Sequence, residues 1–274
     1  MTSPPSTDII LYTSGTPNGQ KASITLEELG LHYEVKNIEI SKNVQKESWF
    51  LRINPNGRIP AIVDKTPAPN GQAKEKRIFE SGALMLYLCQ RYDPQNHLNY
   101  PYDTDQYWEV VEWLIWMQSG LGPMQGQANH FYRYAPEKIE YGIKRYQTET
   151  RRLYQVLEDR LAEQQQQQAQ KAAAGSSNEG GPWIVGDRMT IADIANFAWV
   201  NWAEWAGIDV KPFELLNRWL DRINERSAVK RGLDVPEPFL MKEKLKSKEG
   251  EEEYAQHHSR WVMKGQEADQ KKHG

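Results

Sequence analysis

The junction between a strand and a helix at residues 13–21 constrains the fold of this chain more than any other segment. The apolar run Ile9-Ile10-Leu11-Tyr12 predicts a strand. Thr16 then has the hydroxyl of an N-cap, and Pro17 takes the first helical position, where a missing N–H costs nothing. Asn18 is therefore presented on the first turn, where free N–H groups and the helix dipole favour an anion and lower the pKa of a nearby thiol. The segment itself contains no cysteine, so a thiol activated there must arrive with a ligand.

The first third of the chain alternates strand and helix signals. Residues 33–40 alternate apolar and polar side chains, which predicts a strand with one buried face. Pro60 stands ahead of an apolar strand and suits a sheet edge or a cis bond better than a central ladder position. Ser81 is placed to cap the next helix. The expected strands are 9–13, 33–40, 59–63 and 77–79, the expected helices are 19–29, 45–52 and 82–92, and a hairpin connection covers 65–76.

The rest of the chain has helical periodicity. We expect long amphipathic helices over 104–120 and 136–163. Residues 164–181 are rich in Gln, Ala, Gly and Ser, which predicts a frayed helix end and a flexible loop. Thr190 and Asp193 predict a capping box that opens a buried helix. A further helix is expected over 212–225, and the charged segment 241–274 is expected to be solvated helix or disorder.

Length and composition exclude several classes of function. A chain of 274 residues accommodates two modest domains, and its net charge of −3 predicts neither a nucleic-acid nor a membrane partner. The single cysteine, Cys89, excludes an internal disulfide and a multi-cysteine zinc site, and it fits a reducing cytosol. Cys89 lies among apolar residues and is expected to be an inert buried thiol. We expect no metal site and no targeting segment, so the default is a soluble intracellular protein.

Three motifs in this order and spacing carry a resemblance to a known family. They are Asn54-Pro55-Asn56-Gly57-Arg58-Ile59-Pro60-Ala61, Phe79-Glu80-Ser81-Gly82-Ala83 and Thr190-Ile191-Ala192-Asp193. The chain resembles the cytosolic glutathione transferases over about residues 8–235. Its opening at Thr16-Pro17-Asn18-Gly19 is most similar to the fungal transferases related to the yeast nitrogen-regulator prion protein and to the bacterial nu class.

The resemblance implies an α+β fold in two domains. A thioredoxin-like, glutathione-binding domain would occupy residues 1–94, and an all-α transferase C-terminal domain would occupy 100–240. The flexible loop falls inside the second domain at about 164–181, and the charged tail follows at 241–274.

The resemblance also assigns each end of glutathione a partner. Ile59, ahead of a cis Pro60, would pair its backbone with the cysteinyl peptide. Ser81 and the local N–H groups would take the γ-glutamyl carboxylate, while Glu80 attracts the γ-glutamyl ammonium.

The glycyl end and the second domain supply the remaining expected glutathione contacts. Gln45 is preferred to Lys42 at the glycyl carboxylate, and Arg58 joins the contacts from the same motif as Ile59. Arg145 is the candidate for a basic residue that reaches glutathione from the helical domain.

The sulfur has several candidate partners at the first helix. Asn18 and Thr16 match residues implicated in the fungal and nu classes and are favoured, with Ser14 as runner-up and Tyr12 matching the tyrosine of other classes. Lowering the thiol pKa by about two units needs only about 2.7 kcal/mol of preferential thiolate stabilisation. One or two N–H donors with a helix end supply that, so no general base is required.

The expected activity is that of a glutathione transferase in which the thiolate attacks an electrophile. Glutathione-dependent reduction of a disulfide or peroxide stays open beside conjugation. The missing catalytic cysteine argues only against a mixed-disulfide mechanism on the protein. The alternative is a non-catalytic glutathione-binding regulatory or scaffold protein with the same fold. The resemblance further implies a fungal-type enzyme of the cytoplasm that forms a homodimer and acts in detoxification.

Overall fold

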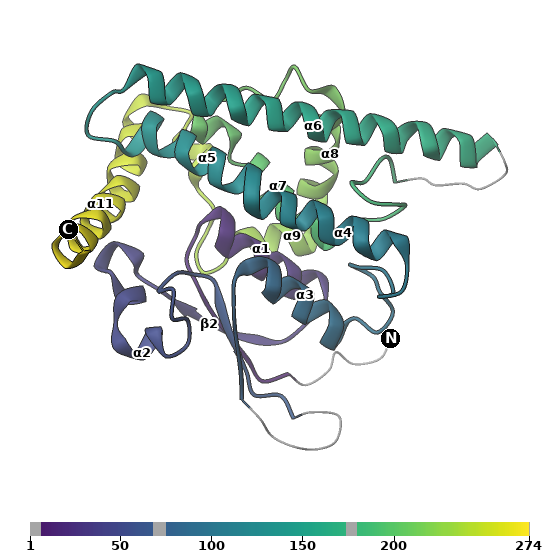
Figure 1. Ribbon diagram of the computed structural model, residues 1–274, viewed down its shortest axis with the longest axis horizontal. Coiled ribbons are helices and arrows are strands. Elements are labelled where there is room, and N and C mark those ends of the chain that lie inside the picture. The colour runs from purple at the N-terminus through teal and green to yellow at the C-terminus, as the bar shows by residue number, and fades with distance from the viewer. Residues whose placement is uncertain (1–6, 68–74, 174–179, 274) are drawn as a thin grey trace.

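The computed structural model describes residues 7–67, 75–173 and 180–273, and in these a mixed α/β half carries a helical half on top of it (Figure 1). A sheet in the order β2-β1-β3-β4 forms the base. β1 runs parallel to β2 and antiparallel to β3, which pairs antiparallel with β4. The strands are β1 (Ile9–Thr13), β2 (Tyr33–Asn37), β3 (Ala61–Asp64) and β4 (Lys76–Phe79).

Helices cover both faces of this sheet. α1 (Pro17–Glu28) and α3 (Ser81–Tyr92) pack on one face through a core that includes Leu11, Leu26 and Leu84. The other face carries the short segments η1 (Ile40–Lys42), η2 (Val44–Lys46) and α2 (Ser48–Leu51), where Phe50 is fully buried. This is the thioredoxin-like arrangement that the order of motifs predicted.

The helical half packs onto α1, so that helix is buried from both sides. α7 and α9 contact α1 directly. Ile24 of α1 and Met85 of α3 join the apolar core of the helical half. The elements of this half are α4 (Asp105–Trp116), η3 (Met117–Leu121), α5 (Gly122–Asn129), η4 (His130–Tyr134), α6 (Glu140–Ala173), α7 (Ile191–Val200), η5 (Ala203–Ala206), α8 (Glu214–Glu225), α9 (Ser227–Leu233), α10 (Met241–Lys244) and α11 (Lys248–His273).

α7 is the central helix of the second domain, and its start follows the predicted capping box. The Thr190 hydroxyl accepts from the N–H of Ala192 at 3.3 Å, and the Asp193 carboxylate accepts from the N–H of Thr190 at 2.8 Å. Every residue of α7 is buried. Asp193 also accepts from Trp219 of α8 at 2.9 Å, so the cap fastens two helices together.

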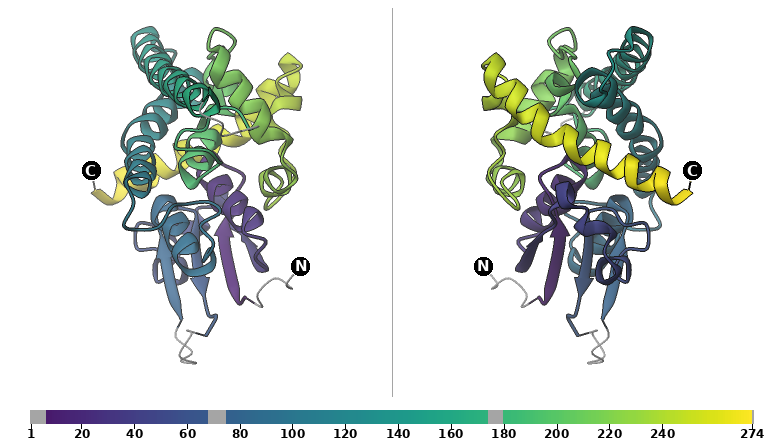
Figure 2. Two further views of the ribbon diagram at one scale, coloured as in Figure 1. Left: turned by 90° about the vertical axis from the view of Figure 1, so that its right-hand side faces the viewer. Right: turned by 90° about the vertical axis from the view of Figure 1, so that its left-hand side faces the viewer.

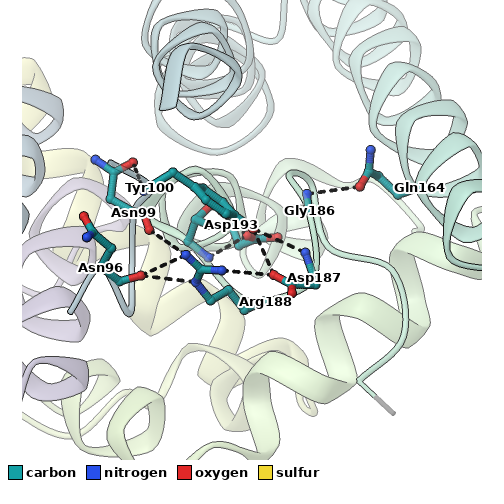
Figure 3. Close-up of polar contacts among 9 residues, drawn as sticks. Asn96, Asn99, Tyr100, Gln164, Gly186, Asp187, Arg188 and Asp193 are labelled. Carbon is teal, nitrogen blue, oxygen red and sulfur yellow. Dashed lines mark hydrogen bonds and ion pairs between the residues drawn. The ribbon is translucent and has the colours of Figure 1, made fainter. Parts of the chain in front are cut away.

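Arg188 ties the segment before α7 to the connection between the two domains (Figure 3). Its guanidinium donates to the carbonyls of Asn96, at 3.0 Å, and of Asn99, at 3.1 Å. The central carbon of the same guanidinium lies 4.0 Å from the centroid of the Tyr100 ring. This polar contact fixes how the helical domain is joined to the first.

Several predicted details differ in the structure. β2 is exposed along most of its length, because nothing covers the outer strand of the sheet there among the described residues. Ser81 is the first residue of α3 and not its cap, a position taken by Glu80.

The glutamine-rich segment is more ordered than its composition predicts. α6 continues through it to Ala173, so the expected loop over 164–181 is helical in its first part, and residues 174–179 lie outside the described residues. Gln164 is buried and accepts from the N–H of Gly186 at 3.1 Å. A tertiary contact therefore holds the start of a segment that has no large apolar residue of its own to bury.

The charged tail forms a long helix that packs on the molecule. α11 crosses one side at the level where the two domains meet (Figure 2), and it contacts both η1 and η4. Glu251 pairs with Arg133, and the ring of Tyr254 lies 5.1 Å from that of Trp205. The tail is therefore helical, which is one of the two expected states, but at these positions it packs on the molecule as well as facing solvent.

The described residues hold no helix that is both long and apolar enough to cross a membrane. They also hold no group of three or more His, Cys, Asp or Glu side chains placed to bind a metal ion. The side chains of His257, His258 and His273 lie outside what the structure describes.

Candidate functional site

Strand register brings three separate segments to one edge of the sheet. Tyr12 on β1 lies opposite Ala61 on β3, and Ala61 lies opposite Phe79 on β4. The residues that follow Tyr12, precede Ala61 and follow Phe79 therefore share that edge. They are residues 13–18, Ile59-Pro60 and Glu80-Ser81, so the motifs that are distant in sequence meet in space.

The start of α1 leaves one residue free to bind a ligand. The Thr16 hydroxyl caps the helix by accepting from the N–H of Gly19 at 3.2 Å, and the Thr16 carbonyl accepts from Gln20 at 2.9 Å. Asn18 is half-buried, and neither its side-chain amide nor its backbone N–H is hydrogen-bonded to any described residue. Ser14 is also half-buried, and its carbonyl accepts from Thr16 at 2.7 Å. Asn18 therefore offers the free donors at the positive end of this helix dipole.

Gly19 allows the helix start to lie against the end of β1. A Cβ on Gly19 would lie 2.2 Å from the Ser14 carbonyl oxygen and 2.5 Å from Thr13 Oγ1. No side chain fits at that separation, so this close approach fixes where Asn18 stands relative to the sheet edge.

The segment before β3 has an unpaired backbone edge. The Ile59–Pro60 peptide is cis, as the resemblance implied. The Asn54 side chain donates to the carbonyl of Arg58 at 2.7 Å and shapes the loop, whereas the backbone of Ile59 has no hydrogen bond to the described chain. Ile59 is half-buried, and the Arg58 side chain is exposed. A peptide ligand can pair with Ile59 in the manner of an added strand.

Glu80 has backbone angles that non-glycine residues rarely adopt. Its φ is 66° and its ψ is 116°. Such conformations cost about 1–3 kcal/mol and concentrate at ligand sites. Glu80 is exposed, while Ser81 beside it is 4% exposed and directs its hydroxyl inward. The pair therefore presents a carboxylate and a helix N-terminus at the same edge.

Lys21 lies beneath this pair and was missed by the sequence analysis. Its side chain is fully buried, and its Nζ donates to Ser81 Oγ at 3.2 Å and to Gln118 Oε1 at 2.8 Å. Burial lowers the pKa of Lys21 to about 7, and the nearby Glu80 carboxylate opposes that shift. This cation joins α1, α3 and the helical domain directly behind the sheet edge.

Gln45 approaches the loop before Ile59 from the other side. It is 5% exposed, and its Oε1 has no hydrogen-bond partner in the described part of the chain. A Cβ on Gly57 would lie 3.0 Å from the Gln45 carbonyl oxygen, which places Gln45 against the loop that leads to Ile59. An unpaired buried amide oxygen costs about 1–3 kcal/mol, so this position fits a ligand group.

Other candidates lie away from the site. Arg145 on α6 is exposed, and its guanidinium is 3.9 Å from Glu149, with no contact to the residues above. Tyr12 packs with Trp49 and Phe50, on the sheet face opposite α1, and burial raises its pKa. Burial likewise raises the pKa of the Cys89 thiol, which is 4% exposed and stays protonated.

Two known family models match most of the chain. The model described as glutathione S-transferase, N-terminal domain, matches residues 7–90, and the corresponding C-terminal domain model matches residues 129–227.

The chain covers nearly the whole length of individual relatives. The chain is 40% identical over 225 residues to the disulfide-bond oxidoreductase YfcG of Escherichia coli, covering 82% of this chain and 94% of that one. The structure of a glutathione transferase homolog from Lodderomyces elongisporus, with two glutathione molecules per subunit, has a TM-score of 0.74 and 42% identity and covers 84% of this chain and 99% of that one. Ure2p in complex with glutathione has a TM-score of 0.74 and 32% identity, covering 84% and 95%.

Proposed function

The chain belongs to the glutathione S-transferase family, and on this premise we propose that the start of α1 stabilises the thiolate of glutathione for attack on an electrophile. The observation that carries the proposal is the pair of unbonded groups at one sheet edge. Asn18 offers free N–H donors there, and the backbone of Ile59 offers a free edge to a peptide. Glutathione is a peptide with a central thiol and satisfies both.

The three candidates for the sulfur are ranked by the bonds they already make. The Thr16 hydroxyl accepts from Gly19, and its proton remains free to donate to sulfur. Asn18 makes no bond that it would have to give up, so we place it first, then Thr16, then Ser14. A thiolate held by an amide donor and a helix N-terminus is stabilised without a general base.

The ends of glutathione take the remaining site residues. We assign the γ-glutamyl carboxylate to Ser81 and the N-terminus of α3, and the γ-glutamyl ammonium to the exposed carboxylate of Glu80. We place buried Gln45 at the glycyl end, where its unpaired Oε1 can accept from the glycyl N–H of the ligand.

Arg58 and Arg145 complete the proposed contacts to glutathione. Arg58 is close in sequence to Ile59 and exposed, so it is placed to meet the glycyl carboxylate. Arg145 reaches glutathione only if its side chain turns away from Glu149.

We place conjugation and disulfide exchange in the same site. In conjugation the thiolate forms an S–C bond and the electrophile releases its leaving group with the bonding pair. In exchange the thiolate attacks the glutathione sulfur of a mixed disulfide, so that oxidised glutathione forms and the second sulfur leaves as a thiolate. The exchange is supported by the name of the Escherichia coli relative and by the two glutathione molecules in the Lodderomyces elongisporus structure.

Paired binding and turnover measurements test this proposal. Glutathione at one hundred times its dissociation constant should stabilise the protein by about 2.7 kcal/mol, measured as a thermal shift. Turnover is then compared for 1-chloro-2,4-dinitrobenzene and for a glutathione-capped disulfide. Binding without turnover of either would favour the non-catalytic alternative, and an unchanged melting temperature would contradict the glutathione site itself.

We further propose a homodimer that uses the outer face of α4. Trp108 and Ile115 are 51% and 54% exposed and lie two turns apart on that face, and Phe79 of the edge strand β4 is 37% exposed. Exposed large apolar side chains on one helix face, such as Trp108 and Ile115, are typical of an interface.

We also propose a division of the chain and a cellular compartment. A glutathione-binding domain at 1–94 and a helical domain at 100–240 with its tail at 241–274 follow the change from mixed to helical elements. The cytosol suits a reaction that consumes a reduced thiol and a chain whose single cysteine forms no internal disulfide. Detoxification is the role that conjugation of an electrophile would serve.

A further inference from the structure

Lys21 occupies a position that the proposed thiolate chemistry does not explain. A fully buried lysine is rare because the charge loses its hydration. Here the side chain bridges Ser81 of the first domain and Gln118 of the second, with Nζ distances of 3.2 and 2.8 Å. A lysine at this depth needs a balancing anion, and among the described residues Glu80 is the acid that acts on it.

We propose that Lys21 is a positioning residue for glutathione, supplying through the Ser81 hydroxyl the positive charge that holds the γ-glutamyl carboxylate. The inference rests on the proposed function and deepens it. Glutathione brings that carboxylate to the N-terminus of α3, so the missing anion arrives with the ligand.

The hydrogen bonds set the direction in which Ser81 donates. The charged form of Lys21 carries only donors, so Ser81 Oγ accepts from it. The hydroxyl proton then has Gln118 Oε1 as its partner at 3.5 Å, while Lys21 already occupies the same oxygen at 2.8 Å. A bond that long is weak and easily exchanged. An arriving carboxylate oxygen offers the Ser81 proton a better acceptor, with a cation behind it.

The other elements packed on α1 leave Lys21 without a second counter-charge. α7 presents the Trp199 ring, 6.0 Å from Nζ, and η3 presents the neutral Gln118. The acid on these packed elements, Asp193 of α7, already accepts from Thr190 and Trp219. The other charged groups are cations: Arg91 of α3 lies over Tyr92, Arg231 of α9 pairs with Glu27, and Lys230 is also on α9. β1 has no charged residue.

Binding and protonation are therefore coupled. Because the pKa of Lys21 is lowered to about 7 by burial, part of the protein carries a neutral amine at neutral pH. A carboxylate near Ser81 favours the charged form and raises this pKa, so glutathione binding takes up a proton. Affinity should then weaken as pH rises above about 7.

The test uses S-methylglutathione, which keeps both carboxylates and the ammonium but has no thiol to titrate. The affinity is compared between pH 6 and 7.5, where the γ-glutamyl ammonium of the ligand stays protonated. If binding raises the pKa of Lys21 by one unit from about 7, the affinity falls by about threefold over this range. Calorimetry in two buffers of different ionisation enthalpy should show the proton uptake directly. In Lys21→Met the affinity should be weaker at pH 6 and flat over this range, whereas Lys211→Met, which removes an exposed lysine, should follow the wild type.

The outcomes separate this inference from the proposed function. A wild-type affinity that does not change with pH, or a pH dependence that persists in Lys21→Met, overturns the role of Lys21 while leaving the glutathione site in place. Failure of the wild type to bind at any pH overturns the proposed function and the inference with it. An analogue that lacks the γ-glutamyl α-carboxylate should bind without pH dependence, and a retained dependence contradicts the assignment.

A second variant tests the role of Lys21 if Lys21→Met does not fold. Gln118→Met keeps the lysine but removes its 2.8 Å acceptor, so the charged form is less stabilised. The midpoint of the affinity profile should move to lower pH. An unchanged midpoint overturns the inference.

Discussion

Replacing Asn18 by Ala tests whether its amide holds the thiolate. The side chain makes no hydrogen bond to the described residues, so the fold should lose less than about 0.5 kcal/mol. A hydrogen bond to a charged group is worth about 1.5–3 kcal/mol, which corresponds to about one to two pKa units. We expect the pKa of bound glutathione to rise by that amount and turnover at pH 6.5 to fall about 10- to 100-fold.

The pH–rate profile with 1-chloro-2,4-dinitrobenzene is the assay. The turnover rates of the wild type and of Asn18→Ala should converge at high pH, because the bound thiol is then ionised in both. Thr16→Val is the matched comparison. It removes the acceptor of the 3.2 Å bond from Gly19, so it should cost about 1 kcal/mol of stability in addition to any change in the profile.

The same pH–rate profiles distinguish Asn18 from Ser14 as the partner of the sulfur. If Asn18→Ala leaves the midpoint unchanged and Ser14→Ala moves it, the sulfur lies at Ser14 and the free amide of Asn18 has another role. A loss of stability of more than about 1 kcal/mol in Asn18→Ala would show that its side chain has a structural partner.

Three further predictions concern packing, protonation and assembly. Gly19→Ala places a Cβ 2.2 Å from the Ser14 carbonyl, so it should lower the urea-derived unfolding free energy by about 1–3 kcal/mol, whereas Gly15→Ala, with nothing within 4 Å, should change it little. The pKa of Lys21 is about 7 in the folded protein, so between pH 7 and 9 the unfolded chain binds more protons than the folded one. The free energy of unfolding of the wild type should therefore rise by about 2 kcal/mol over this range relative to that of Lys21→Met. Equal changes of the unfolding free energy with pH in the two proteins would contradict this. Ile115→Asp should give a monomer by light scattering and Tyr141→Asp, at a 79% exposed site, should not; identical masses would place the interface elsewhere.

Local signals predicted those parts of the fold whose partners are close in sequence. The Thr16 cap, Pro17 at the first turn and the Thr190–Asp193 capping box each depend on residues within one helical turn. The segments at Thr16-Pro17-Asn18, Ile59-Pro60 and Glu80-Ser81, which form the candidate site, were found for the same reason, because each is a short segment at the end of a strand or the start of a helix.

Tertiary contacts decided what the sequence pattern missed. The alternation in residues 33–40 predicted a half-buried strand, but β2 lies at the outer edge of the sheet and is largely exposed. The glutamine-rich segment has no periodic apolar face, yet Gln164 is buried because the N–H of Gly186 needs an acceptor. Neither partner is visible in the local pattern.

Lys21 shows most clearly how a domain arrangement creates a site that periodicity cannot predict. On a helix with one buried face a lysine is assigned to solvent, and α1 has Ala22 and Leu26 facing the sheet. α1 is instead covered on its other side by α7 and α9, and Ile24 belongs to the core of the helical domain. A helix between two layers has no solvent face to which this amine can turn, so Lys21 must find its partners inside, and it finds them behind Ser81. The buried amine behind the proposed γ-glutamyl site is therefore a consequence of how the second domain packs onto the first.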